Sequence, residues 1–294
     1  MNDKTVIIIA GPTAVGKTAA AIELAQRLDT KIISADSRQC FRELDIGVAR
    51  PSPAELRAVQ HYFIASHSIH DQVNAALFEE LALRWTEEIF RERDTVVMVG
   101  GTGLYIQAFC EGLDAIPPVD APTRDQVQAG YEREGIAWLQ EQTRQADPEF
   151  YGSAEIHNPR RLMRALEVKW STGNSILSFR SRHKKQRPFR IRKFGLRLPR
   201  EQLHARIHER VDKMIAAGLP EEVKGLAPYR DSNALQTVGY SELFGWLDGR
   251  LSLAQAAEEI KKNTRRYAKR QMTWFRKDSS IHWTDPGQFP GSIF

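Results

Sequence analysis

The chain has 294 residues, of which 41% are hydrophobic and 27% charged, a composition typical of a globular protein with one large or two smaller domains. No run of about 18 apolar residues is present, which excludes a membrane-spanning helix, and we expect no membrane partner. A predicted strand begins within the first few residues, which leaves no room for a signal peptide. Two cysteines, Cys40 and Cys110, are too few for a disulfide framework or a zinc cluster. We therefore expect a cytoplasmic protein.

Positive charge is concentrated in two segments of the chain, whose net charge is +5. Residues 180–200 contain ten Lys or Arg, residues 261–277 contain eight more, and neither segment contains Asp or Glu. Such segments are typical of a protein that binds a polyanion, whereas a single one is often an ordinary solvated face.

The first motif is Gly11-Pro12-Thr13-Ala14-Val15-Gly16-Lys17-Thr18, between an apolar strand at 6–10 and a helix at 19–25. Strand, G-x-x-x-x-G-K-[ST] and helix is the order of a phosphate-binding P-loop, and a chance Gly-rich turn would not have both elements in register. The backbone N–H groups and the helix N-terminus hold a diphosphate or triphosphate. Lys17 adds positive charge at the outer phosphate, and the Thr18 hydroxyl is a predicted Mg²⁺ ligand.

The next two strands carry the other candidate site residues. A strand at 31–35 ends at Asp36-Ser37-Arg38-Gln39 and completes a βαβ unit, which predicts an α/β fold with a parallel sheet flanked by helices. Polar residues after such a strand lie in the ligand crevice, so Asp36 should lie near the P-loop.

The third strand, 94–99, ends in Gly100-Gly101-Thr102-Gly103. These glycines allow a close approach of backbone to a ligand, or form a tight turn. P-loop ATPases commonly have an acid here that holds Mg²⁺ and sets up the attacking water. Its absence favours transfer of a group to an acceptor over an ATP-driven motor.

A segment with three prolines at 113–122 marks a change in organisation. We interpret it as the entry to an inserted helical subdomain, 116–189, so that the P-loop core is discontinuous, 1–115 and 190–294. The helices predicted for the insert are 121–134, 135–145 and 159–171. The elements predicted after it are a strand at 193–198, helices at 199–217, 239–248 and 251–277, and an edge strand at 281–283. In the long helix, Leu253, Ile260, Tyr267 and Trp274 should form a buried stripe.

Six segments, in this order, resemble the tRNA dimethylallyltransferases, also called tRNA isopentenyltransferases, over nearly the whole chain. They are 11–18, 36–39, 99–105, 164–168, 236–240 and 263–275. The resemblance implies a P-loop NTPase-like core with a helical insert. It also implies Mg²⁺-dependent transfer of the dimethylallyl group from dimethylallyl diphosphate to N6 of adenosine 37 in the tRNA anticodon loop, with release of diphosphate. The sequence departs from the family at His157-Asn158-Pro159-Arg160, commonly His-Pro-Asn-Asp, and at Ser241, commonly Lys.

The resemblance further implies roles for individual residues. Asp36 matches the base that takes the N6 proton, and Thr102 matches a position that orients the adenine. From the residues alone, Asp36 could instead bind Mg²⁺ or cap the next segment, and Thr102 could support only the turn. Lys17, the loop N–H groups and Mg²⁺ on Thr18 would stabilise the leaving diphosphate. The implied tRNA-binding positions are Asp36, Ser37, Arg38, Gln39, Thr102, Arg124, Arg160, Arg161, Leu162, Met163 and Arg164, although each arginine could be ordinary surface charge.

Two further hypotheses stay open on the residues alone. A small-molecule kinase that uses ATP would need the same P-loop, Mg²⁺ and Asp36, but it would not account for the two basic segments. A non-catalytic RNA-binding ATPase switch would need an acid after the third strand. Our expectation is a monomer whose partners are the tRNA anticodon stem-loop and dimethylallyl diphosphate.

Overall fold

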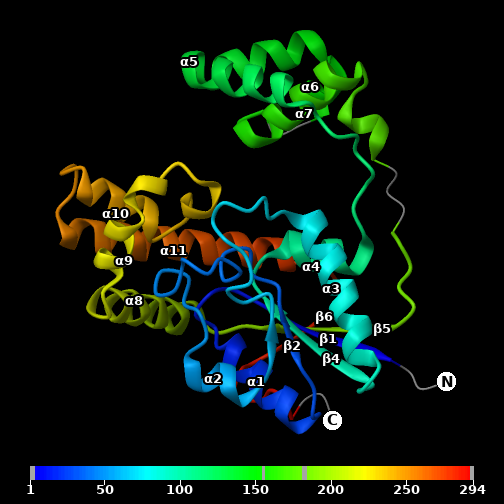
Figure 1. Cartoon of the computed structure of the whole chain (residues 1–294), viewed down its shortest axis with the longest axis vertical. Coiled ribbons are helices and arrows are strands. Elements are labelled where there is room, and N and C mark those ends of the chain that lie inside the picture. Colours follow the sequence, from blue (N-terminus) through cyan, green and yellow to red (C-terminus); the bar gives the residue numbers. More distant parts are fainter. Residues whose placement is uncertain (1–3, 154–155, 181–183, 292–294) are drawn as a thin grey trace. The chain divides into compact units, whose positions relative to one another are not determined.

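The computed structural model describes residues 4–153, 156–180 and 184–291, so Arg182 of the first basic segment lies outside the described residues. The chain divides into two compact units, one formed by Met1–Glu111 with Gln186–Phe294 and the other by Gly112–Lys185. The predicted limits of the insert, 116 and 189, each lie four residues C-terminal to these limits. Figure 1 shows the elements of both units.

The larger unit is built on a six-stranded sheet with the order β3-β2-β4-β1-β5-β6, in which every pair of neighbours is parallel (Figure 1). The apolar run of β1 lies at the centre, paired with β4 on one side and β5 on the other, and is buried on both faces. The predicted fold class is confirmed. The strands are β1 Thr5–Ala10, β2 Ile32–Ser34, β3 His61–Tyr62, β4 Thr95–Gly100, β5 Arg190–Leu196 and β6 Ile281–Thr284.

Helices cover both faces of this sheet. Ile7 and Ile9 belong to a buried cluster with residues of α1 and α8, while Ile8, which alternation directs to the opposite face, is also fully buried. Phe78 of α3 stacks on Tyr105 of α4, with ring centroids 4.6 Å apart. The helices of this unit are α1 Lys17–Arg27, α2 Pro53–Ala58, α3 Ala75–Phe90, α4 Gly103–Glu111, α8 Arg200–Ala216, α9 Leu219–Gly225, α10 Tyr240–Leu247 and α11 Leu253–Phe275, with short 3₁₀ turns η2 Ala227–Tyr229 and η3 Asn233–Leu235.

The buried face of α11 differs from the predicted stripe. Trp274 is 40% exposed, so its assignment to the stripe is wrong. A line of residues seven apart drifts about 20° per heptad around a straight helix, and three heptads separate Leu253 from Trp274. The residues that are buried on α11 are Ala256, Ile260, Ala268, Gln271 and Phe275.

The smaller unit has a hydrophobic core of its own. Its long helix α5 packs against α7 around Val127, Leu139 and Leu166. The helix changes direction at Gly135 (φ 73°), which is the point where the sequence predicts two separate helices. Its elements are α5 Ala121–Ala146, α6 Pro148–Ser153, α7 Pro159–Thr172 and η1 Ile176–Phe179. Within the part of the chain that the structure describes, no helix has the length and apolar character needed to cross a membrane.

Candidate active site

The P-loop joins β1 to α1 in the larger unit. Gly16, directly before α1, has a φ of 104°, a conformation that strongly favours glycine. No side chain caps the start of α1, so the free N–H groups of its first turn are available to an anion.

Lys17 is half-buried at the end of this loop, and its Nζ donates a hydrogen bond to the Pro12 carbonyl at 2.7 Å. Burial, and after it the nearby Arg210 guanidinium, lowers the pKa of Lys17 to about 7, while the Asp36 carboxylate acts in the opposite direction. Near neutral pH the Lys17 side chain is therefore partly deprotonated, and a bound anion would favour its charged ammonium form.

Two arginines of α8 add positive charge to the P-loop. Arg210 donates to the Thr13 hydroxyl at 3.2 Å, and Arg206 donates to the Val15 carbonyl at 3.2 Å. Burial lowers the pKa of Arg210, with Asp36 opposing the shift. Arg210 is not recognisable as a site residue from the sequence, because nothing in the local pattern of α8 indicates that this helix lies beside the P-loop.

Asp36 follows β2 and lines the same cavity, of about 260 Å³, as Lys17 and Thr18. The predicted proximity of Asp36 to the P-loop is confirmed. Its Oδ1 accepts hydrogen bonds from the backbone N–H groups of Arg38 at 2.9 Å and Gln39 at 3.3 Å. Its Oδ2 accepts none from the described residues. One oxygen thus caps the following turn, and the other is available for chemistry.

The glycine turn after β4 is packed against β2. A Cβ at Gly100 would lie 2.1 Å from the Ala35 carbonyl oxygen, so no acidic side chain fits at this end of the strand. Thr102 Oγ1 accepts from the Ser37 N–H at 3.0 Å and donates to the Ser37 hydroxyl at 3.3 Å. Thr102 therefore fixes the segment that carries Asp36.

Gln271 of α11 links the P-loop to the glycine turn. Its Oε1 accepts from the Thr13 N–H at 2.9 Å, and its Nε2 donates to the Gly101 carbonyl at 2.9 Å. A Cβ at Gly101 would lie 2.2 Å from this nitrogen. This role of Gln271 was not predicted from the sequence. The one signal for it is a polar residue near the apolar side of a long helix, where a buried amide needs partners.

The RNA-binding positions predicted next to Asp36 have contacts within the protein. Arg38 donates to the Asn233 side-chain oxygen at 3.3 Å. Gln39 Nε2 donates to the carbonyls of Val48 at 3.2 Å and Ala49 at 3.0 Å, so its amide holds the 45–50 loop.

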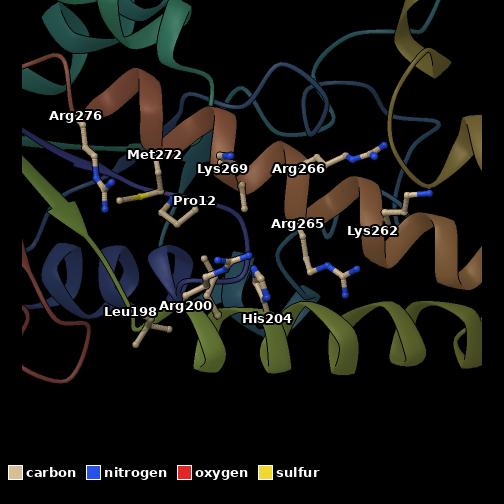
Figure 2. Close-up of a pocket in the computed structure, with 12 residues that line it drawn as sticks. Pro12, Leu198, Arg200, His204, Lys262, Arg265, Arg266, Lys269, Met272 and Arg276 are labelled. Carbon is tan, nitrogen blue, oxygen red and sulfur yellow. The ribbon is translucent and has the colours of Figure 1, made fainter.

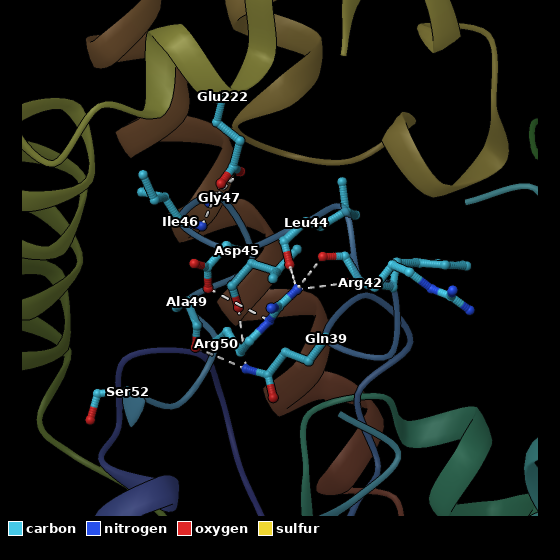
Figure 3. A network of polar contacts seen from close by, with 12 residues as sticks. Gln39, Arg42, Leu44, Asp45, Ile46, Gly47, Ala49, Arg50, Ser52 and Glu222 are labelled. Carbon is cyan, nitrogen blue, oxygen red and sulfur yellow. Dashed lines mark hydrogen bonds and ion pairs between the residues drawn. The ribbon is translucent and has the colours of Figure 1, made fainter. Parts of the chain in front are cut away.

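Figure 3 shows how the 45–50 loop is fixed. Glu222 of α9 accepts from the N–H groups of Ile46 at 2.7 Å and Gly47 at 3.1 Å, and from the Tyr240 hydroxyl at 2.6 Å. The Arg50 guanidinium donates to backbone carbonyls between 41 and 44. These hydrogen bonds fix the 45–50 loop within the larger unit.

The 45–50 loop lines two neighbouring cavities. A second cavity, of about 110 Å³, shares Thr13, Asp36, Arg210 and Tyr267 with the P-loop cavity. Asp36 consequently lines both a polar cavity at the P-loop and a more apolar one. The apolar side chains of the second cavity are Val48, Ala49, Val211, Met214, Val238 and Ile260.

The other predicted RNA contacts belong to the smaller unit. Arg124, Arg160 and Arg161 are exposed, and Arg164 forms an ion pair with Glu167 at 3.6 Å. Met163 packs partly against the core of this unit. Leu162, another predicted RNA-binding position, is fully buried in that core, so its side chain packs inside this unit. Its position follows from α7, which must bury one side against α5.

The described residues contain no group of three or more His, Cys, Asp or Glu that could form a metal cage. The Thr18 hydroxyl lines the P-loop cavity and makes no hydrogen bond to the described residues. The residues fit a cation that takes most of its ligands from phosphate and water, as Mg²⁺ commonly does.

A parallel sheet whose first strand leads through this loop into a helix, with basic residues from a second helix around it, defines a P-loop phosphate-binding protein. A family model described as IPP transferase matches residues 39–278. Because that match covers most of the chain, the chain belongs to the IPP transferase family, as the resemblance in the sequence predicts.

Individual relatives agree with this assignment. The chain is 44% identical to a tRNA dimethylallyltransferase of Cytophaga hutchinsonii, over 97% of this chain and 94% of the relative. Its structure resembles the full-length tRNA isopentenylpyrophosphate transferase of Bacillus halodurans with a TM-score of 0.71 and 35% identity, over 96% and 90% of the two chains. A eukaryotic dimethylallyltransferase acting on tRNA gives a TM-score of 0.81 with 25% identity, over 99% and 77%. These relatives support the transferase hypothesis and not the kinase.

Proposed function

We propose that this chain transfers the dimethylallyl group from dimethylallyl diphosphate to N6 of adenosine 37 in the anticodon loop of tRNA, with release of diphosphate. The observation that carries the proposal is the position of Asp36 between the phosphate-binding cavity and the apolar cavity, with Oδ2 unpartnered among the described residues. A base at this position can reach an acceptor that lies next to the allylic carbon of a diphosphate bound at the P-loop.

The P-loop holds the leaving group. Backbone N–H groups at the start of α1 bind the diphosphate oxygens, and Lys17 and Arg210 stabilise the negative charge that develops as the allylic C–O bond breaks. The pKa of Lys17, about 7 in the empty protein, rises when the diphosphate binds, because a nearby anion favours the ammonium.

Asp36 acts on the acceptor. The N6 lone pair of adenine is delocalised into the ring and is a weak nucleophile. As N6 forms the C–N bond and diphosphate departs, the N6 proton passes to Asp36 Oδ2, a step in which a positioned base contributes about 10² to 10⁴ in rate. Thr102 keeps this carboxylate in place through Ser37.

The Thr18 hydroxyl is our proposed protein ligand for Mg²⁺, which would supply charge neutralisation on the leaving diphosphate. Removal of divalent cations with a chelator should therefore raise the KM for dimethylallyl diphosphate and lower kcat. Addition of Mg²⁺ should restore both.

The target adenine lies in an unpaired loop, so its movement out of the stack costs a few kcal/mol at most. In this proposal Arg38, beside Asp36, contacts the loop bases. The residues that contact the anticodon stem-loop are Arg124, Arg160, Arg161 and Arg164. In this proposal the protein acts as a cytoplasmic monomer. Its two cysteines are free thiols, and both are buried.

The proposal is tested with an unmodified tRNA that carries A36-A37-A38, Mg²⁺, and either radiolabelled dimethylallyl diphosphate or labelled ATP. Label should enter the tRNA from the isoprenoid alone, and a tRNA with guanosine at position 37 should stay unlabelled. ATP turnover without isoprenoid transfer would contradict the proposal.

A further inference from the structure

The 45–50 loop lines three cavities of the larger unit. Val48 and Ala49 line both the P-loop cavity and the second, more apolar cavity. Ala49 also lines a third cavity, of about 780 Å³, between the loop and α8. None of the loop residues lines the separate groove of about 490 Å³ between α8 and α11, which Figure 2 shows. The loop therefore belongs to the surroundings of the reacting centre, yet the proposed reaction gives no role to the hydrogen bonds that hold it.

The backbone of this loop is strained at Ala49. Its φ of 50° lies in the left-handed region, which is unfavourable for a residue that carries a Cβ. Such a conformation persists only where the surrounding structure holds it in place. The amide of Gln39 holds the C-terminal half of the loop, because its Nε2 donates to the carbonyls of Val48 at 3.2 Å and Ala49 at 3.0 Å.

Glu222 of α9 holds the other half of the loop (Figure 3). Its Oε2 accepts from the Ile46 N–H at 2.7 Å, and its Oε1 accepts from the Gly47 N–H at 3.1 Å. Oε1 also accepts from the Tyr240 hydroxyl at 2.6 Å. Because donors face both oxygens, an ionised carboxylate suits this position, whereas an amide would turn its own N–H groups toward one of the donors.

Tyr240 of α10 supports Glu222 and the loop together. The side chain is fully buried, and a Cβ at Gly47 would lie 2.5 Å from Cε2 of its ring, so the loop backbone packs directly against the ring. Burial, and after it the Glu222 carboxylate, raises the pKa of Tyr240 far above its ordinary value. The hydroxyl therefore keeps its proton and remains a donor to Glu222.

The position of the loop matters most for the hydrocarbon part of the proposed donor. A hydrocarbon group makes no hydrogen bonds, so the shape of the apolar surface around it determines where it lies. In the second cavity, Val211, Met214 and Ile260 are carried by α8 and α11, which place them firmly. Val48 and Ala49 are carried by a loop, and loop atoms are placed precisely only when a second layer of contacts supports them.

We infer that Glu222 is a positioning residue for the dimethylallyl group. Through the N–H groups of Ile46 and Gly47, it fixes the loop that directs the allylic carbon toward Asp36. The inference rests on the proposed function, in which the donor is dimethylallyl diphosphate. It gives a role in the reaction to a residue that lines none of the three cavities.

The diphosphate part of the donor should not depend on Glu222. The P-loop is held by hydrogen bonds from Gln271, Arg206 and Arg210. Within residues 4–153, 156–180 and 184–291, no hydrogen bond joins the 45–50 loop to the P-loop. A displaced loop would therefore weaken the fit of the hydrocarbon group and leave the phosphate site intact.

The test is Glu222→Gln, which keeps the size of the side chain and places an amide N–H against one of its donors. The KM for dimethylallyl diphosphate at saturating tRNA should rise at least ~10-fold, as expected when a charged hydrogen-bonding group is lost. The kcat should fall as well, because the allylic carbon is directed less well toward Asp36. The inhibition constant of inorganic diphosphate and the Kd for tRNA should not change.

A milder variant, Tyr240→Phe, keeps the ring against Gly47 and removes only the hydroxyl that donates to Glu222. The KM for dimethylallyl diphosphate should rise by about 2- to 10-fold, again without a change in the inhibition constant of inorganic diphosphate. This variant repeats the test if Glu222→Gln is unstable.

The matched control is Glu43→Gln. Glu43 is also half-buried in the larger unit, and it accepts from the Ser68 hydroxyl at 2.7 Å and the Ile69 N–H at 3.0 Å. It lines none of the three cavities, so the KM for dimethylallyl diphosphate should equal that of the unmodified protein. An equal rise in KM in Glu43→Gln and Glu222→Gln would show a general loss of stability and overturn the inference.

Two other outcomes would also overturn it. One is an unchanged KM for dimethylallyl diphosphate in Glu222→Gln. The other is an equal rise in this KM and in the inhibition constant of inorganic diphosphate, which would assign Glu222 to support of the phosphate site. Failure of the unmodified protein to transfer the isoprenoid would instead refute the proposed function.

Discussion

The two units of the chain present their candidate functional residues in different ways. In the larger unit, the site is assembled from segments far apart in the sequence, as in the hydrogen bonds from Gln271 to Thr13 and from Glu222 to Ile46. In the smaller unit, Arg160 and Arg161 follow each other on the exposed start of one helix. One site depends on buried hydrogen bonds, and the other depends on surface charge.

The difference determines how each unit should respond to substitution. A buried polar group that loses its partner costs about 1 to 3 kcal/mol, and the cost appears in both stability and geometry. An exposed charge contributes about 1 kcal/mol or less, and salt screens it. Substitutions of buried site residues in the larger unit should therefore change stability or the reaction at the site, whereas those in the insert should change only the KM for RNA.

The largest effect is expected for Asp36→Asn. The amide oxygen can still accept from the N–H groups of Arg38 and Gln39, so the turn should persist, but the side chain can no longer take a proton. Transfer should slow by about 10² to 10⁴ in single-turnover assays, with the Kd for tRNA within about twofold of the original. A variant that transfers at half the original rate would remove Asp36 from the role of base.

A smaller loss is expected for Gln271→Met, which keeps the length of the side chain and removes both hydrogen bonds. The Thr13 N–H and the Gly101 carbonyl lose their partners, so unfolding should become easier by about 2 kcal/mol in denaturant titrations. The KM for dimethylallyl diphosphate should rise, because the P-loop is held less firmly.

The matched substitution in the insert is Gln128→Met, at an exposed position of α5. Within the described part of the chain, the amide of Gln128 bonds only to Glu132. Stability and KM should both stay unchanged within error. Equal losses in the two glutamine variants would contradict the contrast between the units.

The pH dependence of the reaction should report Lys17. Its pKa in the empty protein is about 7, so kcat/KM for dimethylallyl diphosphate should fall as the pH rises above 7 and the free enzyme loses this proton. Arg210 contributes to the lowered pKa, so in Arg210→Gln the pKa of Lys17 should rise and the decline should move to higher pH, whatever the loss in absolute rate. If kcat/KM declined at the same pH in both proteins, the decline would not be due to Lys17.

Stability provides a second measure of the same group. Between pH 7 and the ordinary lysine value of 10.5, the unfolded chain binds more protons at this position than the folded chain does. The contribution of Lys17 to the free energy of unfolding should therefore rise with pH across that window, and Lys17→Met should abolish this contribution.

The smallest effect is expected for the double variant Arg124→Gln and Arg160→Gln in the insert. Loss of two exposed charges should raise the KM for tRNA by about 3- to 10-fold at low salt and by less at high salt, with kcat unchanged. A fall in kcat would show that the insert acts on the reacting geometry as well as on binding.

The sequence by itself determined the features that depend on local spacing. The P-loop is defined by eight consecutive residues between a strand and a helix. The place of Asp36 followed from one further rule, that the carboxyl ends of neighbouring parallel strands meet at one edge of a sheet. The break into an insert was visible in the prolines at 113–122.

Only the tertiary structure decided which distant residues complete the site and which predicted contacts are buried. Gln271 and Arg210 reach the P-loop because α11 and α8 pack beside it, and a local pattern carries no information on that packing. The burial of Leu162 and the exposure of Trp274 have a similar cause, because the orientation of a helix depends on the partner that it covers. Local hydrogen bonds and periodicity are encoded in short stretches of chain, but contacts over hundreds of residues depend on how all the elements pack together.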